Sequence, residues 1–96
     1  MAILSFADKE AEAFFFEGDL PRKKTWGQFS SVVRRKLDMI RYAGILGDLA
    51  MVPGNRLEKL KGDLQPLHSI RINDQWRITF QWTDRGAADV KIVDYH

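Results

Sequence analysis

The chain has 96 residues, no cysteine and a formal net charge of +2, so we expect a single domain spanning residues 1–96. The absence of cysteine excludes a disulfide scaffold and any thiolate metal site. A composition of 45% hydrophobic and 29% charged residues is typical of a globular protein. No run approaches the roughly 20 apolar residues of a membrane span, and no signal-peptide pattern is visible, so we expect a cytoplasmic protein without membrane contact.

The charge is distributed unevenly along the chain. Residues 1–19 hold one lysine and five acids, a net charge of −4, and residues 62–96 hold four basic and five acidic residues, a net charge of −1. Residues 20–61 hold ten basic and three acidic residues, a net charge of +7. A basic middle third indicates either a surface that faces a polyanion or a solvated helix face.

The amino-terminal half predicts one strand and two helices. Ile3–Phe6 is a short apolar run, and Asp8 can cap a helix that ends near Gly18. After a basic loop, residues 26–43 predict a longer helix, followed by glycine breaks and a short helical turn at 48–51. The apolar face of the longer helix would consist of Phe29, Val33, Leu37 and Ile40. All three tryptophans are expected in the core.

The carboxy-terminal half predicts three strands, at 68–72, 76–83 and 88–95, because apolar and polar residues alternate in each. The stretch 56–61 is expected to be a linker. The order β-α-α-β-β-β favours an α+β fold, with the two helices packed on one face of a twisted antiparallel sheet.

The polar face of this sheet carries the most informative residues. A three-residue loop at Asn73–Gln75 would place Arg71 directly opposite Arg77. Like charges across neighbouring strands destabilise a sheet, and an anion bound between the two guanidinium groups would compensate for this. The alternative is that each arginine pairs with an acid on a solvated sheet, with Glu58, Asp63 and Asp89 as the candidates.

A second hairpin centred on Arg85 would pair Phe80 with Val90 and Arg77 with Val93. Tyr95 would then lie diagonally from Arg77, and His96 would follow it. This register predicts that the carboxyl terminus lies beside Arg71 and Arg77, which together form the arginine patch. The chain has no phosphate-binding loop, dinucleotide fingerprint or zinc-protease motif, so neither a cofactor nor a metal is expected.

Five segments resemble the HigB-like plasmid-maintenance killer proteins, a family of RelE-like toxins. They are Phe6–Glu10, Arg34–Leu37, Gly54–Asp63, Ser69–Ile78 and Val93–His96. The resemblance implies the fold described above and a toxin that cuts messenger RNA in the A site of the 70S ribosome, without a metal. It also implies neutralisation by a helix-turn-helix antitoxin of the HigA type, in a higher-order complex that binds operator DNA through the antitoxin.

The resemblance assigns catalytic roles to the sheet arginines and the carboxyl terminus: Arg71, Arg77, Asp94, Tyr95 and His96, with Lys61 as an addition. The residues expected to bind RNA or the ribosome are Arg22, Lys23, Lys24, Arg34, Arg35, Arg56, Lys59 and Asn73. Some relatives carry a histidine where this chain has Glu58, so a mechanism that depends on that histidine does not transfer.

The mechanism expected from these residues uses the RNA 2′-hydroxyl as nucleophile. Arginines would stabilise the phosphorane, and His96 or Tyr95 would move protons, although acid and base cannot be assigned separately. Two other functions stay open: a non-catalytic module that binds RNA or protein, and a toxin of the same fold with another target, such as gyrase.

Overall fold

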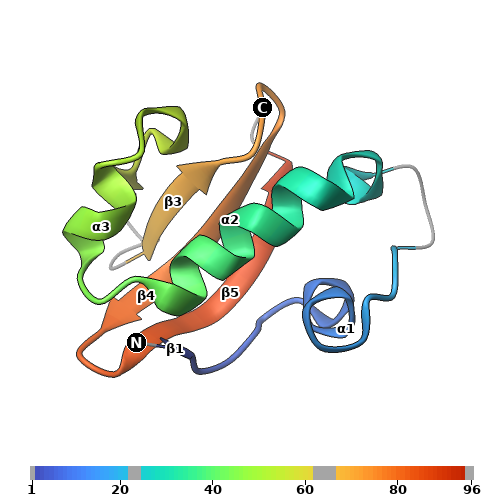
Figure 1. Cartoon of the computed structure of the whole chain (residues 1–96), viewed down its shortest axis with the longest axis horizontal. Helices are drawn as coiled ribbons and strands as arrows, with labels where there is room; N and C mark the ends of the chain where they lie inside the picture. Colours follow the sequence, from blue (N-terminus) through green and yellow to red (C-terminus); the bar gives the residue numbers. More distant parts are fainter. Residues whose placement is uncertain (1, 22–24, 62–66, 95–96) are drawn as a thin grey trace.

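A computed structural model describes residues 2–21, 25–61 and 67–94. In chain order the elements are β1 (Ala2–Ile3), α1 (Lys9–Glu17), a 3-10 turn (Trp26–Phe29), α2 (Ser30–Tyr42), α3 (Leu46–Ala50), a second 3-10 turn (Pro53–Asn55), β2 (Glu58–Lys59), β3 (Leu67–Arg71), β4 (Trp76–Thr83) and β5 (Gly86–Asp94). Figure 1 shows α2 running across the sheet, with α1 and α3 on either side of it.

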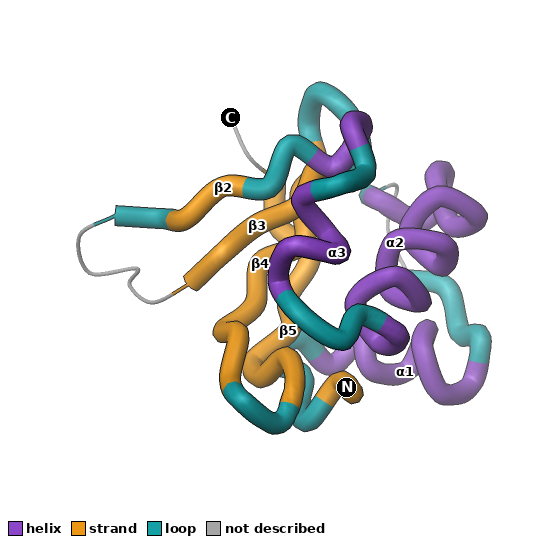
Figure 2. Tube along the Cα trace, turned by 60° about the vertical axis from the view of Figure 1, so that its left-hand side comes forward, coloured by secondary structure: helices purple, strands orange, loops and turns teal. Residues whose placement is uncertain are grey.

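The five strands form one sheet in the order β1-β5-β4-β3-β2. The helices lie on one side of it (Figure 2), so the α+β class with helices on one face is confirmed. The expectation of a purely antiparallel sheet is wrong, because β1 runs parallel to β5. The expected linker at 56–61 contains β2, which pairs antiparallel with β3.

The ends of the first helix follow the prediction. Asp8 Oδ1 accepts hydrogen bonds from the backbone N–H groups of Glu10 and Ala11, at 3.0 and 3.2 Å. Gly18 ends the helix in the left-handed region, with φ of 77°. Asp8 also accepts a long bond from the Ile92 backbone through Oδ2, at 3.4 Å, so the cap touches β5 as well.

The second helix differs from the prediction at its start. Its first predicted turn is a 3-10 turn, and Phe29 is 37% exposed, so the expectation that this ring belongs to the apolar face is wrong. The other three predicted positions, Val33, Leu37 and Ile40, are fully buried. The short helix α3 begins at Leu46, earlier than expected, because Asp48 Oδ2 accepts the backbone N–H groups just before it.

The core lies between the helices and the apolar face of β3, β4 and β5. Ile70, Ile78 and Phe80 are fully buried there, and Trp26 packs edge-on against Phe14 with ring centroids 5.2 Å apart. The other two tryptophans are only partly buried at the edge of this core. Within the described ranges, no helix combines the length and the apolar character that crossing a membrane requires.

The β4–β5 hairpin contains two features that offset each other. Its loop is two residues long, because Thr83 pairs with Gly86, so the predicted centre on Arg85 is wrong. A bulge then places two residues of β5, Asp89 and Val90, opposite one residue of β4, and Asp89 adopts a φ of 53°. The extra residue restores the predicted register, and Arg77 pairs with Val93.

Candidate functional site

The two arginines of the polar sheet face lie side by side at one end of the sheet. Arg71, the last residue of β3, is paired with Arg77 on β4, and Arg77 is paired with Val93 on β5. The predicted register across these three strands is therefore confirmed. Two guanidinium groups on adjacent strands concentrate positive charge, which must be balanced by acids of the chain or by a bound anion.

Arg77 is buried and its guanidinium is engaged by the protein. Nε donates to Ser69 Oγ at 2.8 Å, and Nη2 donates to the Arg56 carbonyl at 2.6 Å. Nη1 lies 3.3 Å from Glu58 Oε1. The alternative that Arg77 pairs with Glu58 is thus the arrangement seen, and this arginine anchors β2 to the sheet. The burial of the Ser69 hydroxyl is explained by the same contact, because it accepts the hydrogen bond from Nε.

Arg71 is more accessible, with 30% of its side chain exposed. Its guanidinium pairs with Asp74, an acid that the sequence did not suggest as a partner and whose side chain is fully exposed. An exposed pair of this kind contributes little to stability and exchanges readily with other ions. Of the two paired arginines, Arg71 is consequently the one that an external anion can reach.

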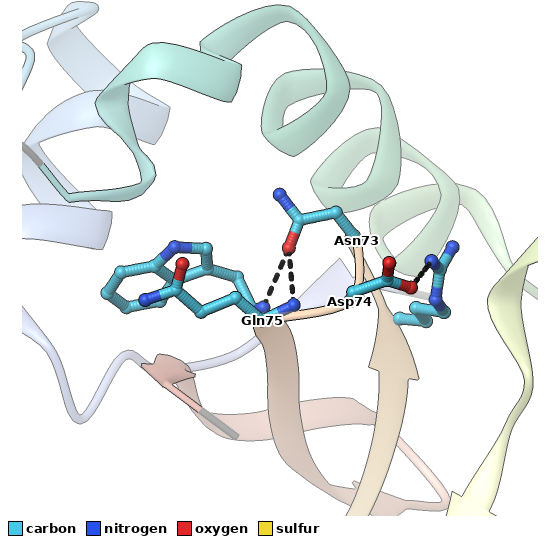
Figure 3. A network of polar contacts seen from close by, with 5 residues as sticks. Asn73, Asp74 and Gln75 are labelled. Carbon is cyan, nitrogen blue, oxygen red and sulfur yellow. Dashed lines mark hydrogen bonds and ion pairs between the residues drawn. The ribbon is translucent and has the colours of Figure 1, made fainter. Parts of the chain in front are cut away.

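The β3–β4 turn carries Asp74, the partner of Arg71, and is held by the side chain of Asn73 (Figure 3). Asn73 Oδ1 accepts the backbone N–H groups of Gln75 and Trp76, at 2.9 and 2.8 Å. Gln75 Nε2 in turn donates to Asp94 Oδ2 at 3.0 Å, and Asp94 is paired with Trp76. The turn therefore links the Arg71 end of β3 to the last described residue of β5.

A third cation lies next to Arg71 and was missed by the sequence analysis. Lys36 on α2 is 4% exposed, and its ammonium donates to Asn55 Oδ1. Burial, followed by the positive charges of Arg35 and Arg71, lowers the pKa of Lys36. The available signal was its spacing, since position 36 follows the buried Val33 by three residues.

Asn55 is the fully buried partner in this network. Its Nδ2 donates to the Leu49 carbonyl at 3.0 Å, while its Oδ1 takes the Lys36 ammonium. The next residue, Arg56, has a φ of 43°, and its carbonyl is the one that accepts from Arg77. The turn at 53–56 thus joins α2, α3 and the arginine patch.

The two neighbouring arginines of α2 have different surroundings. Successive helix residues are about 100° apart, so Arg34 and Lys36 project from opposite flanks of the buried stripe. Arg34 donates to the Phe15 carbonyl at 2.6 Å and lies 3.6 Å from Asp38. Arg35 is exposed, and its positive charge is one of the causes that lower the pKa of Lys36.

The remaining predicted residues fall into two groups. The described ones are exposed or half-buried on the segments around β2 and the β3–β4 turn: Arg56, Lys59, Lys61 and Asn73. The others lie outside the described residues: Arg22, Lys23, Lys24, Tyr95 and His96. The roles assigned to both groups stay predictions.

Comparison with known proteins decides the family. Residues 4–96 match the family described as the RelE-like toxin of the type II toxin-antitoxin system HigB. The chain belongs to the HigB-like toxins. It is 39% identical to Toxin HigB-1 of Vibrio cholerae over 93 residues, which is 97% of this chain and 96% of that protein. An uncharacterised protein of Haemophilus influenzae is 34% identical over 85 residues, or 88% of this chain and 83% of the relative.

As a HigB-like toxin, the chain belongs to a type II toxin–antitoxin system, and an antitoxin is its partner within that system. The resemblance inferred from the sequence is confirmed at this level.

Proposed function

We propose that this HigB-like toxin is an endoribonuclease that cuts messenger RNA on the ribosome by transesterification through the RNA 2′-hydroxyl. The observation that carries the proposal is the register of three strands, which aligns Arg71, Arg77 and Val93. This register brings the end of β5 to the strand end that carries the two arginines. RNA cleavage needs cations at the phosphate and titratable groups beside them.

In this proposal Arg71 binds the scissile phosphate. Its guanidinium is partly exposed and paired only with a solvated carboxylate, which a phosphate can displace. Lys36 adds positive potential behind it. Arg77 acts mainly as a positioning residue, because its three nitrogens are engaged by Ser69, Arg56 and Glu58.

Proton transfer is assigned to the end of the chain. Asp94 is fixed by Gln75 at the edge of the patch, and Tyr95 and His96 follow it directly in sequence. Histidine titrates near pH 6.5 and can act as acid or base, and a tyrosine can do so when nearby cations favour its charged form. Asp94 would orient one of these two groups.

The surface that binds the RNA strand and the ribosome extends from the patch across Arg35 and the basic residues around β2, namely Arg56, Lys59 and Lys61. Asn73 lies at its border, on the turn beside Arg71. The basic residues at 22–24 are proposed to contribute as well. A helix-turn-helix antitoxin that carries the complex to operator DNA completes the proposed system, which operates in the cytoplasm.

The test is messenger RNA cleavage in a translation extract, with cleavage sites mapped by primer extension and the new 3′ ends examined for cyclic phosphate. Replacing Arg71 by Ala should lower the cleavage rate at least about 100-fold, the effect of removing one donor to a developing anion. Arg85→Ala is the matched control, an arginine in the hairpin turn at the other end of β4, and it should cleave at the parent rate. Equal rates for Arg71→Ala and the parent would overturn the proposal.

A further inference from the structure

The flank of α2 that carries Arg34 borders a groove that the proposed RNA site does not use. The groove has a volume of about 670 Å³, and its walls include Ile3, Phe15, Phe16, Arg34, Arg41 and Tyr42. These residues come from β1, α1 and α2, three elements that meet at the β1 edge of the sheet. β2, which Arg77 anchors, forms the opposite edge.

Two aromatic side chains of the groove are largely exposed to solvent. Phe16 is 66% exposed and Tyr42 is 71% exposed, although both are large apolar rings. Phe16 rests edge-on against Phe15, with ring centroids 5.2 Å apart, so it is held in place. Aromatic residues that are fixed and exposed are typical of protein–protein contacts.

Two guanidinium groups in the groove are also held in place. The guanidinium carbon of Arg41 lies 5.8 Å from the Phe15 ring centroid and 5.1 Å from that of Tyr42. The guanidinium carbon of Arg34 lies 5.0 Å from the Phe15 ring centroid. Arg34 is partly neutralised by Asp38. Among the described residues Arg41 forms no ion pair, so it presents a preorganised positive charge.

Fixed aromatic rings beside an uncompensated guanidinium complement a segment that carries both apolar and acidic side chains. A single-stranded RNA also combines negative charge with flat rings, but stacking needs open ring faces. Guanidinium groups already lie over Phe15 and Tyr42, which leaves carboxylates as the better match for their free N–H edges.

The geometry points to this groove as the docking site of the antitoxin, through an acidic segment that places apolar side chains against Phe16 and Tyr42 and a carboxylate on Arg41. The partner follows from the family, and the site does not depend on RNA cleavage. Binding at the β1 edge leaves the opposite edge of the sheet, with β2 and the neighbouring strand β3 that ends at Arg71, uncovered. The antitoxin would therefore neutralise the toxin from a surface separate from the proposed catalytic one.

The probe is the antitoxin protein encoded beside this toxin, purified and titrated into the full chain by calorimetry. The variants Arg41→Glu and Tyr42→Ala should each weaken binding at least about tenfold, the effect expected of a central contact. Both side chains are exposed, so circular dichroism and thermal unfolding should match the parent. Arg35→Glu, on the outward side of α2, is the matched control and should bind the antitoxin with parent affinity.

Ribosome binding and messenger RNA cleavage are measured on the same variants. Parent-like cleavage by Arg41→Glu together with weaker antitoxin binding supports the docking site. If the parent chain itself shows no cleavage, the proposed nuclease function fails, but weaker antitoxin binding by the groove variants still supports the docking site. Unchanged antitoxin affinity in both groove variants would overturn it. Loss of ribosome binding with intact antitoxin affinity would also overturn it, by showing that the groove holds RNA.

Discussion

Arg77 and Glu58 form an ion pair that joins the edge strand β2 to the middle of the sheet, with Nη1 3.3 Å from Oε1. The arginine is almost fully buried, whereas about half of the glutamate side chain is exposed. The same guanidinium donates to Ser69 and to the Arg56 carbonyl. One side chain thereby supports a two-residue strand that has few contacts of its own.

Arg77→Ala should therefore destabilise the fold as well as reduce activity. It leaves the buried Ser69 Oγ and the part-buried Arg56 carbonyl without their donor, at a cost of about 2–3 kcal/mol in the free energy of unfolding. Urea unfolding measures this, with Arg71→Ala as the comparison, which should change stability much less because the Arg71 side chain is partly exposed and pairs with a solvated acid. Equal stability of Arg77→Ala and the parent would show that the buried contacts are replaced by water.

Asp74→Asn should strengthen RNA binding. It removes the exposed carboxylate that competes with phosphate for Arg71 while keeping the shape of the turn. The affinity for a short single-stranded RNA should rise, and its salt dependence should become steeper, because one more phosphate contact is made without displacing an acid. Asp84→Asn, in the other hairpin turn, is the control. Identical affinities for both variants would argue against a phosphate at Arg71.

Lys36 should make stability depend on pH in the alkaline range. Its pKa is lowered in the folded protein, so between that value and the unfolded value of 10.5 the lysine is neutral when folded and charged when unfolded. Unfolding then takes up a proton, and the free energy of unfolding rises with pH across this window. Lys36→Met should remove that rise. Parallel pH curves for Lys36→Met, the parent and the exposed-lysine control Lys91→Met would contradict the prediction.

Gly86→Ala should separate β1 from β5. Gly86 has a φ of 142°, and an added Cβ would lie 2.1 Å from the Ala2 carbonyl oxygen. We expect a loss of at least about 2 kcal/mol in the free energy of unfolding, because the backbone must move. Gly18→Ala is the control, since that glycine also has positive φ but open space around it, and it should cost about 1–2 kcal/mol. Equal losses would mean that β1 adjusts without strain.

The features that local chemistry determines were predictable from the sequence. The side-chain oxygen of Asp8 and the left-handed Gly18 define α1, and the β3–β4 turn fixes Arg71 opposite Arg77. The strand β4 was predicted with its observed bounds, Trp76–Thr83, because its alternation is long and regular.

The features that depend on distant contacts were not predictable. β2 has two residues and no periodicity, so only its pairing with β3 identifies it as a strand. The burial of Arg77 depends on a carbonyl 21 residues away, and that of Lys36 on Asn55, 19 residues away. From the sequence alone, a polar residue in a strand or helix pattern is assigned to the exposed face. Its burial becomes understandable only when the fold shows which hydrogen-bond partners surround it.

The bulge at Asp89 has a consequence for how the chain tolerates insertions and deletions. Asp89 is the extra residue between the pairs Gln81–Ala88 and Thr79–Lys91, so removing it would leave a regular ladder in which Ile92 and Asp94 keep their faces. The amino-terminal segment is seated on the same irregularity, since Ser5 accepts the backbone N–H groups of both Asp89 and Val90. A one-residue deletion there would remove a contact that seats the amino-terminal segment while keeping Arg77 opposite Val93.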